Sequence, residues 1–327
     1  MSNAFAQELH TAIQAVQEAS RICTHVQASM SGDAMEKKDK SPVTIADYAS
    51  QAIICKLILE QFPNDLIVGE EDAGDLRLPA HAESRERVHR EISRLGISAT
   101  QEDVLSWIDA GDHDATAARY WTLDPIDGTK GFLRKEQFAI SLALLVNKQL
   151  EVAALACPNL PYGAERGVVF YATRGQGAWM MPLNQPAAEP QQVHVSNIGD
   201  ISSARFCESV ESGHSAHDQS ARLLEKLGVT STTVRMDSQA KYGAVARGDA
   251  EIYLRLPTRA GYEERIWDHA GGALVVEEAG GTVTDLSGLP LDFAAGPTLR
   301  NNRGVVVTNR RLHADVLAAL KDLHFPS

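Results

Sequence analysis

The chain has 327 residues, of which 44% are hydrophobic and 23% charged, and its formal net charge is -12. This length and composition are typical of a globular protein with one large domain or two of ordinary size. The acidic balance excludes general affinity for nucleic acid, because the phosphate backbone would be repelled. No apolar run approaches the roughly 20 residues that span a bilayer, and the N-terminus lacks the pattern of a leader, so we expect no membrane partner.

The first half of the sequence predicts helices followed by strands. Apolar residues at helical spacing, with Phe5 and Leu9 among them, indicate a helix at the start. The polar segment 31–41 indicates a loop, and the charge-rich stretch 80–119 is interpreted as an elaboration without site residues. We predict helices over 4–28, 44–61, 84–95 and 101–109, and strands over 66–68, 120–123, 139–146, 151–156, 167–171 and 177–181.

The second half alternates between strands and helices after a proline-rich segment at 182–192, which marks the best domain boundary. We therefore predict an N-terminal α+β domain over 1–185 and a C-terminal α/β domain over 186–327. Alternation of this kind is typical of a layered α/β sandwich. The strands are predicted over 204–207, 231–235, 250–255, 281–284 and 304–308, and the helices over 216–227, 238–247, 267–279 and 310–322.

The cysteines are scattered along the chain and form neither a CxxC motif nor a disulfide framework. We interpret them as buried thiols in a reducing compartment and expect a cytoplasmic protein. They are Cys23, Cys55, Cys157 and Cys207.

The most informative stretch begins at Trp121 and reads Trp-Thr-Leu-Asp-Pro-Ile-Asp-Gly-Thr. Asp124 and Asp127 follow an apolar run, and Gly128 then permits a turn that bares backbone N–H groups. Carboxylate oxygens beside such a turn suit magnesium-dependent phosphoryl chemistry. A purely structural type I turn, which also favours Asp, Pro and Gly, is the alternative.

Three more acidic residues stand at the edges of predicted elements. Glu70 follows a short strand, Asp268 opens a predicted helix, and Asp47 lies in the first turn of another. Each has an ordinary structural interpretation, since carboxylates commonly cap helices or occupy solvated loops. The chemical interpretation rests on all of these acids occurring together with Asp124 and Asp127.

Together these motifs resemble the lithium-sensitive, magnesium-dependent inositol monophosphatase superfamily. The resemblance rests on Gly69-Glu-Glu71, the stretch from Trp121 to Thr129, and Trp267-Asp-His-Ala-Gly-Gly272. It extends over roughly residues 5–325 and comes closer to the bisphosphate nucleotidase branch. The motifs that favour that branch are Asp39 to Tyr48, Lys130 to Arg134, Gly213-His214, Asp237 to Tyr242 and Tyr253 to Pro257.

The resemblance implies a role for each matching residue and the family's α-β-α-β-α architecture. It makes Glu70, Asp124, Asp127 and Asp268, with the Ile126 carbonyl, the ligands of two or more Mg²⁺ ions that lithium displaces. Asp47 and Thr129 match the pair that activates the attacking water, and Gly128 with Thr129 matches the backbone that holds the scissile phosphate. Residues matching the nucleotide site are His214, Ser238, Lys241 and Arg255.

The nucleotide-binding residues also have structural interpretations of their own. Ser238 fits a helix N-cap, Lys241 fits a solvated helix face, and His214 fits an ordinary loop histidine. Arg255 is the most persuasive ligand, because it interrupts an apolar strand where an unpaired charge would be costly.

The resemblance implies a phosphoric monoester hydrolase that removes the 3'-phosphate of adenosine 3',5'-bisphosphate, and that also accepts the sulfated precursor. Hydrolysis of inositol mono- or polyphosphates is the sibling alternative, because the metal site is shared. A non-catalytic nucleotide and metal sensor is the alternative from another class, which the Asp47–Thr129 pair disfavours. We expect a small-molecule substrate, no nucleic-acid partner, and a monomer or homodimer.

Overall fold

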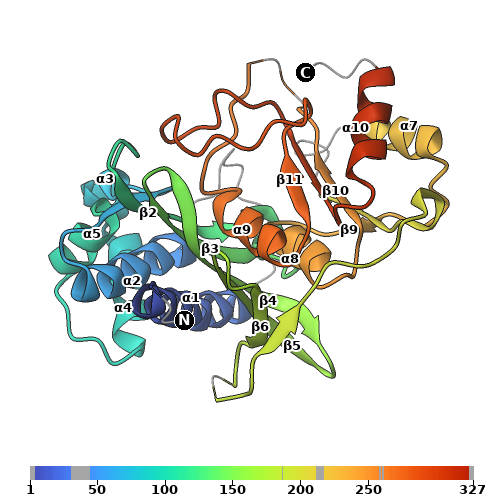
Figure 1. The fold of residues 1–327 in the computed structure, drawn as a ribbon. Helices are drawn as coiled ribbons and strands as arrows, with labels where there is room; N and C mark the ends of the chain where they lie inside the picture. The colour runs from blue at the N-terminus through green and yellow to red at the C-terminus, as the bar shows by residue number, and fades with distance from the viewer. Residues whose placement is uncertain are drawn as a thin grey trace.

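The computed structural model describes residues 4–30, 45–185, 187–210, 217–257, 259 and 261–323. Helices and sheets alternate through the molecule in five layers, α-β-α-β-α (Figure 1). Three hydrophobic clusters fill the spaces between these layers. The predicted layered sandwich is confirmed.

The first two layers are a helical pair and a large sheet. Helices α1 (Ala6–Ser29) and α2 (Ile45–Gln61) pack against each other and cover one face of the sheet. Only β1 and β2 pair in parallel, and the later neighbours are antiparallel. The strands, in spatial order, are β1 (Leu66–Gly69), β2 (Arg119–Asp127), β3 (Ala139–Val146), β4 (Gln149–Tyr162), β5 (Glu165–Thr173), β6 (Ala178–Pro182) and β7 (Gln191–Val193).

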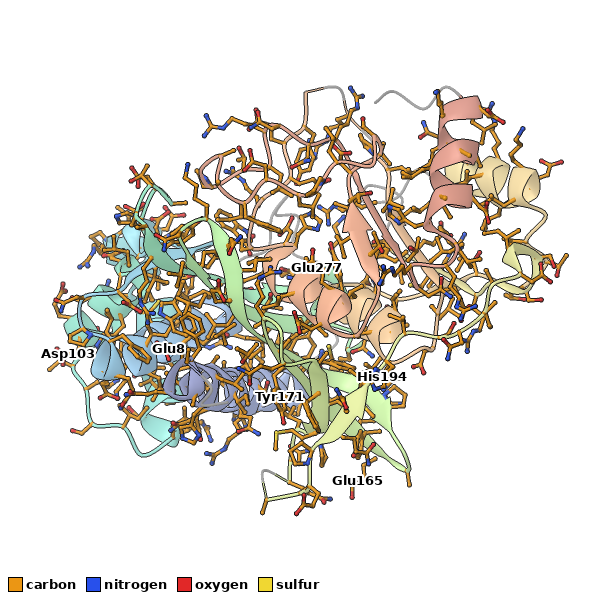
Figure 2. The ribbon with its side chains drawn as sticks, viewed as in Figure 1. Glu8, Asp103, Glu165, Tyr171, His194 and Glu277 are labelled. Atoms are coloured by element: carbon orange, nitrogen blue, oxygen red, sulfur yellow. The ribbon has the colours of Figure 1, made fainter. Side chains whose placement is uncertain are left out.

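The middle layer consists of α8 (Ala240–Ala246) and α9 (Ala270–Glu278), which lie between the two sheets. Both helices are apolar nearly all round, as burial on both sides requires. Close packing also demands glycine, because a Cβ on Gly272 would lie 2.4 Å from the ring of Tyr242. In Figure 2, the labelled Tyr171 lies on β5 of the large sheet and Glu277 on α9 above it.

The second sheet is smaller and is covered on its outer face by α7 (His217–Leu227) and α10 (His313–Asp322). Parallel pairing brings the carboxyl ends of β8, β9 and β10 to one edge. The strands, in spatial order, are β11 (Thr282–Thr284), β12 (Val305–Thr308), β10 (Ile252–Arg255), β8 (Phe206–Glu208) and β9 (Val234–Arg235).

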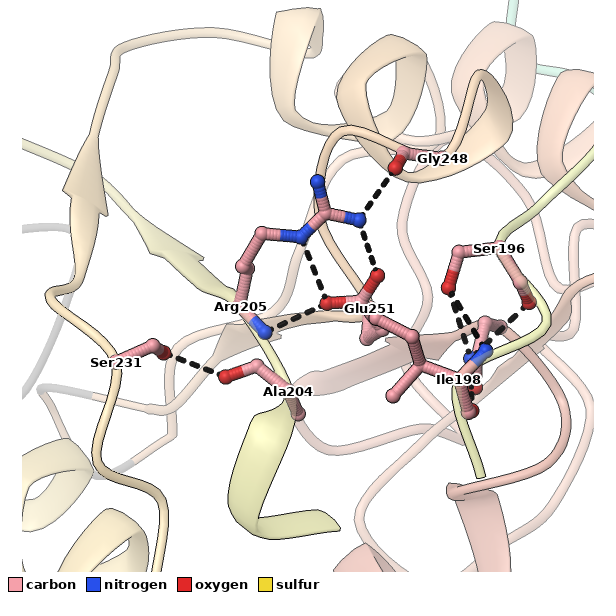
Figure 3. Close-up of polar contacts among 8 residues, drawn as sticks. Ser196, Ile198, Ala204, Arg205, Ser231, Gly248 and Glu251 are labelled. Atoms are coloured by element: carbon pink, nitrogen blue, oxygen red, sulfur yellow. Dashed lines mark hydrogen bonds and ion pairs between the residues drawn. The ribbon is translucent and has the colours of Figure 1, made fainter. Parts of the chain in front are cut away.

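One ion pair secures the start of this sheet. Glu251, just before β10, is fully buried and accepts hydrogen bonds from the backbone N–H of Arg205 at 2.6 Å and from its guanidinium at 2.5 and 3.1 Å. The guanidinium also donates to the carbonyl of Gly248 at 2.6 Å (Figure 3). Both carboxylate oxygens of Glu251 are therefore satisfied.

The predicted elements that fall within the described ranges are present, with shifted ends. The strand predicted over 120–123 continues to Asp127, and the helices predicted from Ser238 and Trp267 begin at Ala240 and Ala270. The four cysteines are buried and free, as predicted. The two-domain division at residue 185 stays a prediction; β7, which follows it, still pairs with β6 in the large sheet. The remaining elements are α3 (Gly74–Arg77), η2 (Pro79–His81), α4 (Ala82–Arg94), α5 (Gln101–Asp109), α6 (Thr129–Leu133) and η3 (Ile201–Ser203).

Within the ranges that the structure describes, no helix is both long and apolar enough to cross a membrane.

Candidate active site

The end of β2 displays the two acids of the central motif. The register of β2 against β3 shifts between Asp124 and Asp127, so the strand is irregular at Pro125, which has no N–H to donate. The hydroxyl of Ser50 on α2 donates to the carbonyl of Pro125 at 2.8 Å and so fixes the irregular segment from the helical layer. The hydrogen bond from Ser50 therefore holds in place the backbone that carries both carboxylates.

The turn after Asp127 depends on glycine. Gly128 has φ of 85°, and a Cβ there would lie 3.0 Å from the Cβ of Ser238, so a side chain would be both strained and crowded. The next residue, Thr129, donates its hydroxyl hydrogen to the carbonyl of Ile126 at 3.2 Å. This turn brings the end of β2 into contact with the residues before α8.

Glu70 reaches the same edge because β1 runs parallel to β2. The buried Gln51 of α2 holds the segment after β1, since its amide accepts from the N–H of Glu71 at 3.1 Å and donates to the carbonyl of Ile108 at 2.9 Å. Gly69 also donates to the carbonyl of Gly111 at 2.8 Å. The stretch 80–119 is thus more than an elaboration: its end supports the strand that presents Glu70.

Asp268 arrives from the other half of the chain, just before α9. Arg255, at the end of β10, lies 3.3 Å from Asp268 and 2.7 Å from Glu264. The fully buried His269 lies 3.3 Å from Glu264 and 2.7 Å from the hydroxyl of Tyr242. A continuous polar chain therefore runs from the middle layer to Asp268 and holds it in place.

The acids lie close enough to one another for their charges to raise the pKa values of Glu70, Asp124 and Asp268. Burial, and next the charges of Glu70 and Asp127, hold the pKa of Asp124 well above its ordinary value. Burial and the charge of Asp268 likewise raise the pKa of Glu70. The pKa of Asp268 rises to about 6, chiefly through burial, although Arg255 acts to lower it. We call Glu70, Asp124, Asp127 and Asp268 the acid cluster.

The chemistry of the acid cluster suits a cation. Asp124 is 1% exposed, and its buried Oδ1 has no hydrogen-bond partner among the residues that the structure describes. Such an atom is costly unless something positive contacts it. A set of carboxylate oxygens is also what Mg²⁺ prefers.

A neighbouring group of potential ligands, Glu264, Asp268 and His269, does not fit a cation of its own. Burial acts to raise the pKa of Glu264, but the charge of Arg255 lowers it to about 2. Arg255 thus already supplies the positive charge at Glu264, and only Asp268 of this group belongs to the acid cluster.

Gln239 is a functional residue that sequence reasoning missed. It is 2% exposed, and its backbone N–H donates to Asp127 Oδ2. Its side chain donates to the carbonyl of Trp267 at 2.9 Å and accepts from Ser141 and from the N–H of Gly272, both at 3.1 Å. Gln239 therefore ties Asp127 to the segment that carries Asp268.

The predicted nucleotide residues have mixed placements. Lys241 is 2% exposed, donates to the carbonyl of Met236 at 3.2 Å and lies 5.1 Å from the ring centroid of Tyr253. The solvated-face interpretation is therefore wrong, and burial lowers the pKa of Lys241. Ser238 is not the predicted N-cap: its φ is 71°, and its hydroxyl accepts from the N–H of Ala240 at 3.1 Å.

Comparison with known proteins identifies the group to which this architecture belongs. Residues 5–324 match the inositol monophosphatase family. The chain belongs to that family. A 3'(2'),5'-bisphosphate nucleotidase of Schizosaccharomyces pombe is 44% identical over 98% of this chain and 98% of its own length. One from Emericella nidulans is 41% identical over 97% of this chain and 98% of its own length.

The fold of the family is shared with solved structures. Thermotoga maritima IMPase superposes with a TM-score of 0.65 at 19% identity, covering 97% of this chain and 98% of that chain. The resemblance to the inositol monophosphatase superfamily and its bisphosphate nucleotidase branch is thus confirmed.

Within this family fold, the structure gathers most of the predicted site residues, but one lies outside the described ranges. Asp47 is 2% exposed and lies in the first turn of α2. Its charge contributes to the raised pKa values of Asp124 and Glu70. His214 falls outside the described residues, and its role stays a prediction. The structure adds Ser50, Gln51, Gln239 and Glu264 as supports that no spacing in the sequence distinguished.

Proposed function

We propose that the chain is a magnesium-dependent phosphatase that removes the 3'-phosphate of adenosine 3',5'-bisphosphate and releases AMP. The observation that carries the proposal is the acid cluster, with its buried and unpartnered Asp124 oxygen. The names of relatives at 41% and 44% identity over nearly the whole chain support the choice of substrate.

In this proposal the acid cluster and the carbonyl of Ile126 hold two or more Mg²⁺ ions. Magnesium held there supplies positive charge that polarises the phosphate and favours ionisation of water. Lithium is expected to inhibit by replacing a weakly held ion. Bound cations would relieve the mutual repulsion of these carboxylates and would replace the protons that the raised pKa values of Glu70, Asp124 and Asp268 favour.

Asp47 and Thr129 accept the proton that the attacking water loses. The hydroxyl of Thr129 has one hydrogen, which Ile126 accepts in this structure, so its oxygen can still accept a hydrogen bond from water. Rotation of that hydroxyl toward Asp47 would pass the proton to a carboxylate acting as general base. Backbone N–H groups at Gly128 and Thr129 orient the phosphate oxygens.

The second phosphate of the nucleotide needs cations outside the acid cluster. Lys241 and Arg255 are the proposed ligands, with Ser238 and His214 donating hydrogen bonds. Arg255 already contacts Glu264 and Asp268, so the 5'-phosphate would join or replace the 3.3 Å contact to Asp268. The sulfated precursor carries the same 3'-phosphate and is proposed as a second substrate.

The test is phosphate release with Mg²⁺ from adenosine 3',5'-bisphosphate, compared with inositol 1-phosphate and repeated with EDTA and with LiCl. We expect efficient release from the nucleotide alone, none in EDTA and less in LiCl. Faster release from inositol 1-phosphate would favour the sibling activity. Tight nucleotide binding without release from either compound would favour the sensor.

Arg255→Ala tests the proposed phosphate contact separately. Loss of a charge-assisted contact predicts a KM for adenosine 3',5'-bisphosphate about 10-fold higher or more. The KM for adenosine 3'-phosphate, which has no second phosphate, serves as the comparison. An unchanged KM for the bisphosphate contradicts the role assigned to Arg255.

A further inference from the structure

Tyr262, an aromatic residue near Arg255, has no role in the mechanism proposed above. Tyr262 lies in the connection between β10 and α9, and it is 43% exposed, one of the few large apolar side chains so exposed among the described residues. The guanidinium of Arg255 lies near the hydroxyl of Tyr262 and acts to lower its pKa, which burial raises. The guanidinium carbon of Arg259 lies 5.4 Å from the ring centroid.

These contacts hold the ring in place without burying it. Arg255 lies near the polar end of Tyr262 and is itself fixed by its 2.7 Å contact to Glu264. Arg259 adds a cation–π contact on the ring. A ring that is restrained by its contact to Arg259 and still open to solvent loses little entropy when a flat ligand stacks on it.

We propose that Tyr262 is the platform on which the base of the nucleotide stacks. The inference rests on the proposed function and adds a specificity residue to the same site. Arg255 links the two ends of the site, since it contacts Asp268 of the acid cluster at 3.3 Å and also lies near Tyr262. A ligand with phosphates at one end and an aromatic ring at the other matches this order.

The platform also separates the nucleotide from an inositol phosphate. A base has a π-face that gains from stacking on an aromatic side chain, and every base has one, so the contact selects nucleotides without selecting among bases. An inositol ring is saturated and offers no such face. Tyr262 therefore favours nucleotides, whereas the acid cluster serves any phosphate monoester.

The experiment compares Tyr262→Phe with Tyr262→Leu by calorimetric titration with AMP and with ribose 5-phosphate. We expect Tyr262→Leu to raise the Kd for AMP about 10-fold or more, because base stacking is lost. Tyr262→Phe keeps the ring and should stay within about threefold of the unaltered protein. The ratio of the Kd for ribose 5-phosphate to the Kd for AMP should fall with Leu and hold with Phe.

Trp179→Leu is the matched control, because it makes the same aromatic-to-leucine change on β6 of the large sheet. It should leave both affinities unaltered. Equal AMP affinity for Tyr262→Leu and the unaltered protein would overturn the platform, while hydrolysis by the unaltered protein would still uphold the proposed function. Failure of the unaltered protein to release phosphate would instead overturn the proposed function itself.

A second measurement uses the unaltered protein and does not depend on how the variants fold. Irradiation with 8-azidoadenosine 5'-phosphate, followed by peptide mapping, should place the adduct on residues 261–265. Excess AMP should suppress the adduct, and excess ribose 5-phosphate should suppress it far less. An adduct elsewhere, with residues 261–265 unlabelled, would overturn the platform.

Discussion

Glu251 and Asp124 are both buried carboxylates next to or within a strand, yet their surroundings are opposite. Glu251 is 0% exposed, and Arg205 satisfies both of its oxygens (Figure 3). Asp124 is 1% exposed, its Oδ1 has no partner in the described part of the chain, and Glu70 and Asp127 repel it. Burial acts to raise both pKa values, but hydrogen bonds from Arg205 lower that of Glu251, whereas that of Asp124 stays raised.

The difference separates a carboxylate that supports the fold from one that awaits a ligand. A buried acid with a complete set of donors stabilises its neighbourhood, and removing its partner is what costs stability. A buried acid without donors destabilises the fold and persists because something else binds it. The same residue type at similar burial therefore serves two purposes, and the local donors decide which.

Asp124→Asn should have the largest effect of the variants that test this comparison between Asp124 and Glu251. Loss of one ligand charge from the acid cluster should lower kcat/KM by about 10³-fold, since metal charge contributes several kcal/mol to the transition state. The thermal midpoint in EDTA should stay level or rise, because the variant removes a repelled charge. Phosphate release and circular dichroism provide the two readouts. A large fall in the midpoint would mean that Asp124 supports the fold as Glu251 does.

The pH dependence of stability in EDTA follows from the same contrast. In the folded protein the carboxyls of Glu70, Asp124 and Asp268 have raised pKa values, so the folded state binds more protons than the unfolded state above about pH 4. Stability should therefore fall as pH rises from about 4 through 6, by about 3 kcal/mol from Asp268 alone.

The contribution of Glu251 to stability changes with pH in the opposite direction and over a different pH range. Its folded pKa is lowered, so its contribution is present above the unfolded pKa and is lost only as pH falls below about 4. Urea unfolding across the pH range measures both effects. Mg²⁺ and Asp124→Asn should each flatten the loss above pH 4, and an unaltered slope in both cases would contradict the assignment.

Glu251→Gln should affect stability but not chemistry. The change leaves Arg205 without its anionic partner, and because that arginine is 42% exposed, water compensates in part. We expect a loss of about 1–2 kcal/mol in the free energy of unfolding, below the range for fully buried pairs. Turnover per folded molecule should stay within about twofold of normal, as judged by phosphate release. A fall comparable to that of Asp124→Asn would show that the small sheet transmits strain to the acid cluster.

Sequence reasoning predicted the layers well because hydrophobic spacing records burial directly. The strand before Asp124 and the helix containing Asp47 lie close to their predicted positions. The acids were predicted as a set because each stands at the edge of a predicted element and because together they resemble the family. The structure adds the parallel pairing of β1 and β2, which brings the ends of both strands to one edge. The element ends were less accurate, since the turn at Ser238 depends on an unusual φ that no spacing reveals.

The supports of the site could not be predicted, for a physical reason. A buried glutamine such as Gln51 or Gln239 looks like a surface glutamine in the sequence. Only the fold places the side-chain amide of Gln51 against Glu71 and the backbone N–H of Gln239 against Asp127. Likewise, the family resemblance predicted Arg255 as a phosphate ligand, and its place on an apolar strand made it the most persuasive of the matching residues. The structure shows that two acids later in the chain, Glu264 and Asp268, also stabilise it there.

Arg90→Ala should have the smallest effect and sharpens the comparison from its other side. Arg90 and Glu86 form an ion pair of 3.2 Å along α4, but their side chains are 58% and 63% exposed. Water already solvates both charges, so the pair should contribute less than about 0.5 kcal/mol to the free energy of unfolding. Chemical denaturation of the variant in low and high salt tests this. A loss as large as that for Glu251→Gln would contradict this interpretation. It would mean that charge attraction alone, without burial or a full set of hydrogen bonds, accounts for the stabilising effect of Arg205 on the small sheet.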